Sequence, residues 1–244
     1  MFRAMIDSFI KTVFPNHCLC CDKLIMGDYF CKDCDGLVVP IDLKTCKKCG
    51  HPMKLCSCKW NFYYFDGIIG CFENDNENKT SFYRFKFGAN FKGGEFFVWH
   101  LTQLIKKRYG QKEFDYITCV PADKTNRHTR KYNHLEFLTR KVAKELKIKR
   151  KRLLSVAKSV PKQHKAKTFN ERYDNVNEKY SAVKNVDLKN KKVLLIDDIK
   201  TTGATLSECA RQLKLKGAAE VFAAVSLVTY PAKNNNDNLI ENSV

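Results

Sequence analysis

Two adjacent aspartates and the short threonine- and glycine-rich segment behind them form the most distinctive chemical pattern of this chain. Asp197 and Asp198 directly follow the aliphatic run 193–196. Paired carboxylates suit the hydroxyls of a sugar diol, and successive backbone amides that open a helix form a cradle for phosphate. Because carboxylates repel a phosphate unless each serves a different part of one ligand, the pattern predicts a sugar-phosphate site with Mg²⁺ nearby. The residues expected at the phosphate are Thr201, Thr202, Gly203, Ala204 and Thr205.

A simpler alternative for the same segment is a helix cap. Asp198 or Thr202 would then only satisfy the first amides of the following helix. A cap explains one polar residue and not the whole run, so the sugar-phosphate site is favoured. Lys200 lies inside the run and is compatible either with a contact to a phosphate or with an orientation toward solvent.

Eight cysteines form four close pairs, three with the spacing C-x-x-C and one with the spacing C-x-C. A C-x-x-C turn points two thiolates at a common centre, and two such pairs complete a tetrahedral zinc site that is closed to water and therefore structural. Eight sulfurs predict two zinc sites. The simplest assignment joins neighbouring pairs: the first site has Cys18, Cys21, Cys31 and Cys34, and the second has Cys46, Cys49, Cys56 and Cys58.

Several alternatives to this zinc assignment remain open from the sequence. The pairs could interleave, and Cys20 could replace Cys21 as a ligand. A redox dithiol or an iron–sulfur cluster would use similar spacings. Ligation by sulfur alone argues against a catalytic zinc, which keeps an open position. The isolated cysteines, expected to be small buried apolar residues, are Cys71, Cys119 and Cys209.

Positive charge is concentrated in about a quarter of the chain. The sequence has 44 Lys and Arg residues against 26 Asp and Glu, a formal net charge of +18. Residues 127–192 hold 21 basic and 6 acidic side chains, which is +15 of that excess. A solvated lysine-rich face is the simple alternative, but a concentrated charge of this size repels itself in a compact chain. The excess therefore favours a polyanionic partner such as nucleic acid, phosphates or an anionic membrane surface.

The basic stretch also has the composition of a surface that binds single-stranded nucleic acid. Such surfaces combine cations that follow the phosphate backbone with aromatic rings on which bases stack. Most aromatic residues of the stretch are expected in the core or at a hinge instead of stacking on bases. These aromatic residues are Tyr132, Phe137, Phe169, Tyr173 and Tyr180. The cations expected at a nucleic acid are Lys147, Lys149, Arg150, Lys151 and Arg152.

A parallel sheet is the structure that would position these side chains. The run 193–196 is typical of a strand buried on both faces, and open parallel sheets bind ligands at the carboxyl ends of their strands. Two more strands are expected at 114–120, which ends at a natural pyrophosphate-binding turn (Pro121, Ala122 and Asp123), and at 220–229. Helical spacing follows at 135–146 and from residue 206. The polar, basic segment 158–180 lacks periodicity and is expected to act as a lid.

Length and composition agree with a globular chain of one medium and one small domain. No window approaches 18 consecutive apolar residues, so no membrane span is expected. The N-terminal residues mix apolar and charged types, which predicts a short amphipathic helix and no secretory signal. We therefore expect a cytoplasmic location, where clustered cysteines bind metal more often than they form disulfides. The expected divisions are a helix at 1–15, a zinc module at 16–64, a sheet domain at 65–231 and a disordered tail at 232–244.

Residues 197–205 resemble the signature for phosphoribosyl pyrophosphate (PRPP) in type I phosphoribosyltransferases. Four cysteine pairs ahead of such a domain resemble the ComF family, and further matches extend over nearly the whole chain. Three residues depart from the family pattern: Lys131 replaces a usual Gly, His134 a usual Gln and Lys200 a usual aliphatic residue. The further matching residues are Phe14, Pro15, Lys86, Phe87, Gly88, Arg130, Asn133, Gln163, Arg172 and Asn175.

The resemblance implies a type I phosphoribosyltransferase-like α/β fold, a parallel sheet flanked by helices, with a small N-terminal double zinc-ribbon module. It implies that PRPP binds with Mg²⁺, with the catalytic pair Asp197 and Asp198 on the ribose hydroxyls and residues 201–205 on the 5′-phosphate. Arg130 or Lys131 would assist the pyrophosphate. The family is associated with the handling of incoming single-stranded DNA in natural transformation, which implies a role in DNA uptake and competence alongside proteins of the uptake machinery.

Three functions are compatible with these patterns. The first is a phosphoribosyltransferase that displaces pyrophosphate from PRPP. The second is a non-catalytic protein that binds single-stranded nucleic acid and reuses the fold, and the third is a PRPP-sensing scaffold whose zinc module recruits a partner. Fold alone does not choose among them. A competence-type protein with a working PRPP pocket is the favoured interpretation, and no residue is identified as the base for an acceptor.

Overall fold

A computed structural model of the chain describes residues 16–56, 58, 62–88, 91–110, 112–122, 133–157 and 179–230. The helix expected at 1–15, nearly all of the lid expected at 158–180 and the tail expected at 232–244 lie outside these described residues. Within the described ranges, no helix combines the length and the apolar character needed to cross a membrane.

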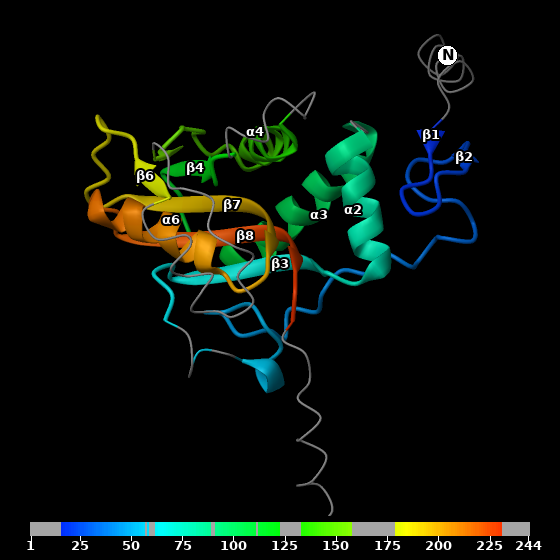
Figure 1. The fold of residues 1–244 in the computed structure, drawn as a ribbon, viewed down its shortest axis with the longest axis horizontal. Helices are drawn as coiled ribbons and strands as arrows, with labels where there is room; N and C mark the ends of the chain where they lie inside the picture. The colour runs from blue at the N-terminus through cyan, green and yellow to red at the C-terminus, as the bar shows by residue number, and fades with distance from the viewer. Residues whose placement is uncertain are drawn as a thin grey trace, which may run out of the picture.

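Four parallel strands form the central sheet, in the order β3, β8, β7, β4 (Figure 1). The two central strands, β7 and β8, are rich in aliphatic residues because both faces of the sheet are covered. The strand predicted at 220–229 is confirmed as β8, and the one predicted at 114–120 is confirmed in a shorter form as β4. The bounds are β3 (Gly67–Glu73), β4 (Tyr116–Cys119), β7 (Lys192–Lys200) and β8 (Glu220–Val228).

Strand β7 is longer than the aliphatic run 193–196 predicts. It continues through both aspartates to Lys200, because β8 still runs beside it: Asp197 pairs with Val225 and Lys200 pairs with Val228. The prediction that the strand stops at the carboxylates was therefore wrong. Hydrogen bonding to a neighbouring strand holds these polar residues in extended backbone, and this pairing leaves no trace in local hydrophobicity.

Helices cover both faces of the sheet. Helices α2 (Asn76–Gly88), α3 (Phe91–Tyr109) and α4 (His134–Leu146) pack together on one face, where α3 contacts β3 and β8 and α4 contacts β4. Helix α6 (Ala204–Leu215) connects β7 to β8, and a right-handed connection puts it on the opposite face. The helical spacings at 135–146 and from residue 206 are confirmed by α4 and α6. A cluster of buried phenylalanines, Phe72, Phe82, Phe85 and Phe97, fills the α2–α3 side of the core.

A short antiparallel ribbon stands beside the sheet. Its strands are β5 (Leu154–Val156) and β6 (Tyr180–Ala182), and the segment 158–178 connects them. The chain just before β5 extends the sheet past β4, since the amide of Ile117 donates to Lys149 and the amide of Lys151 donates to Ile117. The described residues on either side of the expected lid meet in this ribbon, since the amide of Ala157 donates to Lys179 at 2.9 Å.

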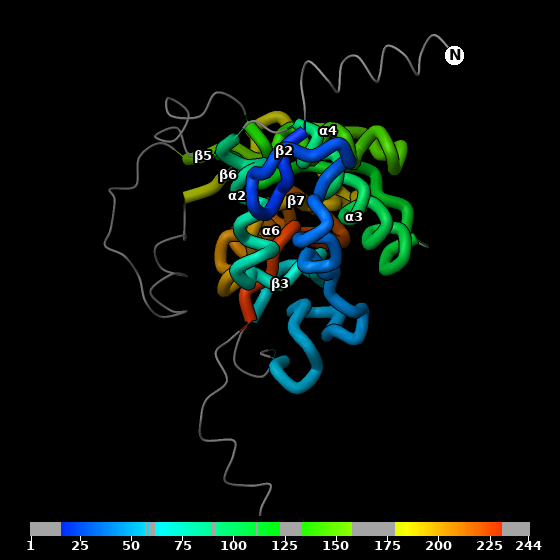
Figure 2. Tube along the Cα trace, turned by 90° about the vertical axis from the view of Figure 1, so that its right-hand side faces the viewer, coloured from blue at the N-terminus to red at the C-terminus, as the bar shows by residue number. Residues whose placement is uncertain are grey.

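The cysteine-rich region docks at two separate places. The first part, with strands β1 (Asn16–His17) and β2 (Leu24–Ile25), lies against α2 and α3, where Arg84 pairs with Asp22 at 2.8 Å. The second part, with the 3-10 turn η1 (Met53–Leu55), lies next to β3, where the amide of Ile68 donates to Lys47. Figures 1 and 2 both show the two parts at different ends of the molecule, in dark and light blue.

Candidate functional site

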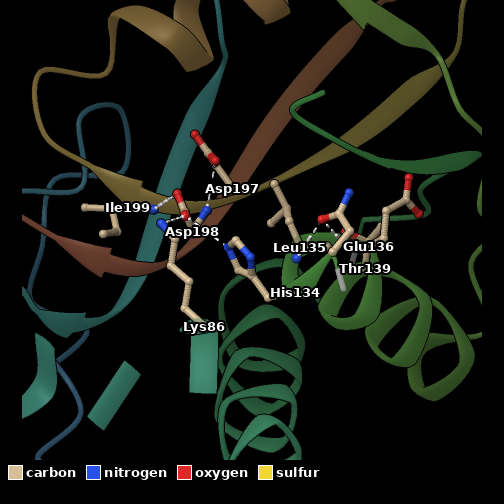
Figure 3. Close-up of polar contacts among 9 residues, drawn as sticks. Lys86, His134, Leu135, Glu136, Thr139, Asp197, Asp198 and Ile199 are labelled. Atoms are coloured by element: carbon tan, nitrogen blue, oxygen red, sulfur yellow. Dashed lines mark hydrogen bonds and ion pairs between the residues drawn. The ribbon is translucent and has the colours of Figure 1, made fainter. Parts of the chain in front are cut away.

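The two aspartates lie at the carboxyl end of β7, the position from which open parallel sheets contact ligands (Figure 3). Asp197 is buried, with 8% of its surface exposed, and its Oδ1 accepts a hydrogen bond from the amide of Asp198 at 2.9 Å. Asp198 is more open, with 20% of its side chain exposed, and its Oδ1 accepts from the amide of Ile199 at 2.8 Å. The two carboxylates are thus held by the backbone before any ligand arrives.

Two basic side chains from other elements converge on the second aspartate. The ammonium group of Lys86, at the end of α2, donates to Asp198 Oδ2. His134 Nε2, at the start of α4, lies 3.1 Å from the same oxygen. An ionised carboxylate only accepts hydrogen bonds, so His134 carries its proton on Nε2. Three segments, one with Asp198 and two that lie 112 and 64 residues from it in the sequence, therefore meet at one oxygen atom.

The surroundings shift the pKa values of the two carboxyl groups in opposite directions. Burial and the neighbouring charge of Asp198 raise the pKa of Asp197 well above its usual value. Burial also acts to raise the pKa of Asp198, but the hydrogen bond from His134 and the charge of Lys86 outweigh it and hold this pKa below its usual range. The surroundings therefore favour the neutral form of Asp197 and the ionised form of Asp198.

The segment after β7 turns sharply into α6. Gly203 has φ +85° and is the residue before the first helical turn. An added Cβ there would lie 3.1 Å from Tyr63 Cε1, so both the backbone and the space require glycine. The hydroxyl of Thr202 accepts from the amide of Ala204 at 3.3 Å. This is the local contact that the helix-cap alternative predicts, but it engages only one hydroxyl of the segment, and the first amides of α6 have no partner within the helix.

Lys200 takes neither of the two orientations considered from the sequence. Its side chain is 1% exposed, and its Nζ lies 2.6 Å from Nε2 of His51 in the second cysteine-rich part. Its ammonium group therefore faces the second cysteine-rich part instead of solvent.

The end of the neighbouring strand β4 contributes a small basic recess. A cavity of about 50 Å³ is lined by Pro121 and Ala122 on one side and by the segment 150–152 on the other. This volume admits one or two water molecules but no sugar phosphate. The residues expected to bind pyrophosphate nearby, Asp123, Arg130 and Lys131, lie outside the described residues, as do Gln163, Arg172 and Asn175.

The cations expected at a nucleic acid follow one continuous stretch from the end of α4 along the sheet edge. Lys147, Lys149 and Arg152 are exposed. Arg150 is engaged by Glu136 at 2.5 Å, and the ammonium of Lys151 lies over the ring of Tyr116 at 5.2 Å from its centroid.

Two of the aromatic residues interleaved with this charge, Phe137 and Tyr180, are buried in the core. They are therefore not free to stack on bases. The other three, Tyr132, Phe169 and Tyr173, lie outside the described residues.

The eight paired cysteines gather as the simplest assignment predicts. In each group the four Sγ atoms lie within 4.8 Å of one another, and the groups are sequential: 18, 21, 31 and 34, then 46, 49, 56 and 58. Four converging sulfurs fit a tetrahedral structural zinc ion. Cys20 is not in the first group, because its Sγ contacts Ser81 Oγ at 3.1 Å on α2. The interleaved arrangement and the exchange of Cys20 for Cys21 were thus open alternatives that the structure does not adopt.

Backbone hydrogen bonds prepare one thiolate in each group for a metal. Burial raises the pKa of Cys18, but amides of its own turn and of Cys31 outweigh it and lower this pKa to about 6. Burial also raises the pKa of Cys46, but hydrogen bonds from the amides of Cys49 and Lys48 outweigh it and lower this pKa to about 7. Away from the groups, Cys71 and Cys209 are buried as expected, whereas Cys119 is partly exposed at the recess of β4.

Sequence reasoning did not assign Lys86 or His134 to the aspartates. Both lie in motifs that resemble the ComF pattern, in which His134 replaces the usual Gln. The residue types were the available signal, because lysine and histidine are common partners of a buried carboxylate. Their sequence distance from Asp198 hides the pairing, which depends on how α2 and α4 pack over the sheet.

Comparison with known proteins places these features in context. Residues 136–241 match the phosphoribosyl transferase domain model. The chain is 26% identical over 196 residues to competence protein ComFC of Streptococcus pneumoniae, which covers 78% of this chain and 84% of that protein.

Two examples of solved structures that are similar to part of this chain both have TM-scores below 0.5. One is the purine phosphoribosyltransferase of Pyrococcus horikoshii, with 21% identity, a TM-score of 0.33, and coverage of 55% of this chain and 71% of that one. The other is the glutamine PRPP amidotransferase of B. subtilis, with 22% identity, a TM-score of 0.35 and coverage of 51% of this chain. This chain spans about a quarter of the amidotransferase's length, since 25% of that chain is covered.

Proposed function

We propose that this ComFC-like protein, which carries a phosphoribosyl transferase domain in its second half, binds PRPP with Mg²⁺ at the carboxyl end of β7. The observation that carries the proposal is the junction of β7 and α6. There the carboxylates of Asp197 and Asp198 precede, within a few residues, a glycine turn and the first amides of a helix. This junction supports a ligand that has hydroxyls at one end and a phosphate at the other.

The two carboxyl groups would serve the ribose in different ways. Asp198, whose ionised form is favoured, would accept a hydrogen bond from one ribose hydroxyl, and Asp197, whose neutral form is favoured, would form a hydrogen bond with another. Their opposite pKa shifts support this division. The 5′-phosphate would lie on the amides of residues 202–205, where the positive end of the α6 dipole favours an anion.

Lys86 and His134 would act mainly by keeping Asp198 ionised. A carboxylate that is already charged when PRPP arrives accepts a hydroxyl hydrogen bond without first losing a proton. Lys86 also adds a positive charge to a site that must hold a ligand with several phosphates. Bound magnesium would neutralise part of the pyrophosphate charge.

Phosphoribosyl transfer would follow only where an acceptor reaches the same site. The bond between ribose C1′ and pyrophosphate would break, and the acceptor would form the new bond to C1′. The ribose gains positive charge in this step, so the nearby ionised Asp198 would stabilise it electrostatically. The chemistry of this chain's described residues supports ribose and phosphate binding and identifies no acceptor base.

Calorimetric titration with PRPP and Mg²⁺ tests the binding proposal. We expect Asp198→Asn to weaken PRPP binding by roughly 10- to 100-fold, the loss of one hydrogen bond to a charged group. Asp197→Asn should weaken it less, because burial favours the neutral form of this carboxyl group and asparagine is also neutral. Asp115→Asn is the matched control, since Asp115 lies at the opposite end of the sheet and pairs with Lys191. Absence of PRPP heat in the zinc-loaded parent protein would contradict the proposal.

A second candidate function, binding of single-stranded DNA, is favoured by the exposed cations along the sheet edge. The name of the pneumococcal relative, a competence protein, supports DNA uptake as its setting. For single strands the slope of log affinity against log salt is about −0.7 for each phosphate contact. Replacing Lys147, Lys149, Arg150 and Arg152 by Ala should therefore reduce the slope for an oligonucleotide by up to about 3.

Replacement of Lys106 and Lys107 by Ala is the control for this DNA experiment. These lysines are exposed at the end of α3, away from the edge of β4. The control should keep the parent slope. Binding that does not respond to salt, or an equal change in both variants, would exclude the sheet edge as the DNA surface.

A further inference from the structure

Lys200 is a fully buried lysine that the proposed PRPP site does not use. It is the last residue of β7, with 1% of its surface exposed, and its carbonyl accepts from the amide of Thr229 at 2.8 Å. Its ammonium meets His51 Nε2 at 2.6 Å. His51 in turn lies between Cys49 and Cys56 in the sequence, and its Nδ1 lies 3.3 Å from the carbonyl of Leu55.

A buried ammonium group needs a compensating negative charge. Burying an unpaired charge is strongly unfavourable, and a neutral hydrogen-bond acceptor relieves only part of this penalty. His51 is such an acceptor, since its Nε2 faces the ammonium group and its Nδ1 faces the carbonyl of Leu55. The thiolates that act on Lys200 are those of Cys49 and Cys58, in the second cysteine group.

The same cysteine group needs positive charge once a metal is bound. A zinc ion with four thiolates has a net charge of −2, and groups that contact the ligands from outside typically change metal affinity by 10- to 100-fold when removed. The backbone ties His51 to this group, since the amide of Cys46 donates to the carbonyl of His51 at 2.7 Å. Lys200, which lies on the sheet, therefore contacts this cysteine group indirectly, through His51.

We infer that Lys200 is a positioning residue that holds the second zinc–thiolate site against the sheet and, through that contact, sets the shape of the phosphate-binding turn. Lys200 Cε lies 3.4 Å from the position of a Cβ on Gly203, so the lysine chain runs directly under that turn. The ring of Tyr63 also lies next to this Cβ position, with its Cε1 at 3.1 Å. Loss of zinc would let the four thiolates take up protons, which would remove the negative charge that holds Lys200 and would free the floor of the turn. This second half of the inference rests on the proposed function.

Zinc release from the full-length, zinc-loaded chain tests the first half. A chromogenic chelator such as 4-(2-pyridylazo)resorcinol reports the release of two equivalents. We expect Lys200→Met to speed the release of one equivalent about tenfold or more and to leave the other unchanged. Lys200→Arg keeps the charge and should restore slow release. Lys192→Met is the control: it makes the same change at the other end of β7, where Lys192 lies near Glu220.

A second variant tests the same contact if the first variant does not fold. If circular dichroism shows that Lys200→Met is unfolded, His51→Leu removes the acceptor and keeps the lysine, and it should speed release of the same single equivalent. Unchanged release in both variants, or equal acceleration of both equivalents, would overturn the inference.

PRPP titration of the same variants tests the link to the phosphate-binding turn. We expect Lys200→Met to weaken PRPP binding, whereas Lys192→Met should not. Faster zinc release with unchanged PRPP affinity would refute the link and leave the zinc contact standing. Absence of PRPP binding in every form, including the parent, would refute the proposed function, and zinc release would still decide the role of Lys200.

Discussion

The two adjacent carboxyl groups of this site differ in charge because they differ in surroundings. Asp197 is buried and forms no ion pair with the described residues, whereas Asp198 faces Lys86 and His134. The consequence is an unequal contribution to stability. Asp198 satisfies two buried basic side chains, 11% and 4% exposed, and Asp197 adds a carboxyl group that burial disfavours in its charged form.

Substitution of each aspartate by asparagine should therefore change stability in different ways. We expect Asp198→Asn to lower the free energy of unfolding by about 1–3 kcal/mol, because it leaves buried basic groups without their charged partner. Asp197→Asn should leave stability unchanged or raise it. Urea denaturation at pH 7 measures both. A larger loss for Asp197→Asn than for Asp198→Asn would contradict the assignment of the charges.

The pH dependence of stability gives the sign of the Asp198 effect. Its pKa is lower in the folded protein than in the unfolded chain, so its stabilising contribution is complete above about pH 4 and declines as the pH falls below it. The parent protein should therefore lose more stability than Asp198→Asn between about pH 5 and pH 3. Equal losses in the two proteins, measured by denaturation at each pH, would mean that Asp198 gains nothing from its partners.

The turn between β7 and α6 is the element that joins the two halves of the proposed site. Its shape depends on Gly203, which combines a positive φ with side-chain atoms of Tyr63 and Lys200 around it. Gly36 has a similar φ of +81°, but an added Cβ there would meet nothing within 4 Å. A comparison of the two glycines therefore distinguishes the cost of backbone strain from the cost of crowding by neighbouring side chains.

Replacement of each glycine by alanine measures these effects. Strain alone should lower the free energy of unfolding by about 1–2 kcal/mol in Gly36→Ala. Gly203→Ala should lose more than that, because Tyr63 or Lys200 must also move, and it should weaken PRPP binding. Equal losses in the two variants and unchanged PRPP binding would show that the turn tolerates a side chain.

The elements show why some features can be predicted from sequence and others cannot. The aliphatic run 193–196, the helical spacing of α4 and the cysteine spacings are local, and each predicts its structure. The extension of β7 to Lys200 and the pairing of Lys86 and His134 with Asp198 depend on neighbouring segments. The burial of Lys200 also depends on a distant segment. Its sequence neighbours are typical of an exposed loop, but its partner His51 lies 149 residues away.

At the scale of the whole molecule, the two cysteine-rich parts contact different regions of one sheet domain. The first contacts α2 and α3, and the second contacts β3 and the end of β7. Small segments such as these bury too little apolar surface to fold without a staple, so metal binding and docking should be coupled. Loss of one metal should therefore affect one side of the molecule.

Adjacent cysteines in the first part allow a matched test of the zinc assignment. Elemental analysis should find two zinc equivalents per chain in the parent protein. Cys21→Ser should retain one equivalent, because Cys21 belongs to the first group, and Cys20→Ser should retain both, because Cys20 contacts Ser81 instead. Iron with visible absorbance, or loss of zinc in Cys20→Ser, would contradict the assignment.

The position of PRPP on the protein decides whether the junction of β7 and α6 is a sugar-phosphate site. The measurement is a crystal structure of the zinc-loaded chain with PRPP and Mg²⁺. We expect both ribose hydroxyls within hydrogen-bonding distance, about 2.6–3.2 Å, of Asp197 and Asp198, and the 5′-phosphate on the amides of residues 202–205. PRPP bound elsewhere, or these carboxylates still engaged only by Lys86, His134 and the backbone at saturating PRPP, would contradict the account.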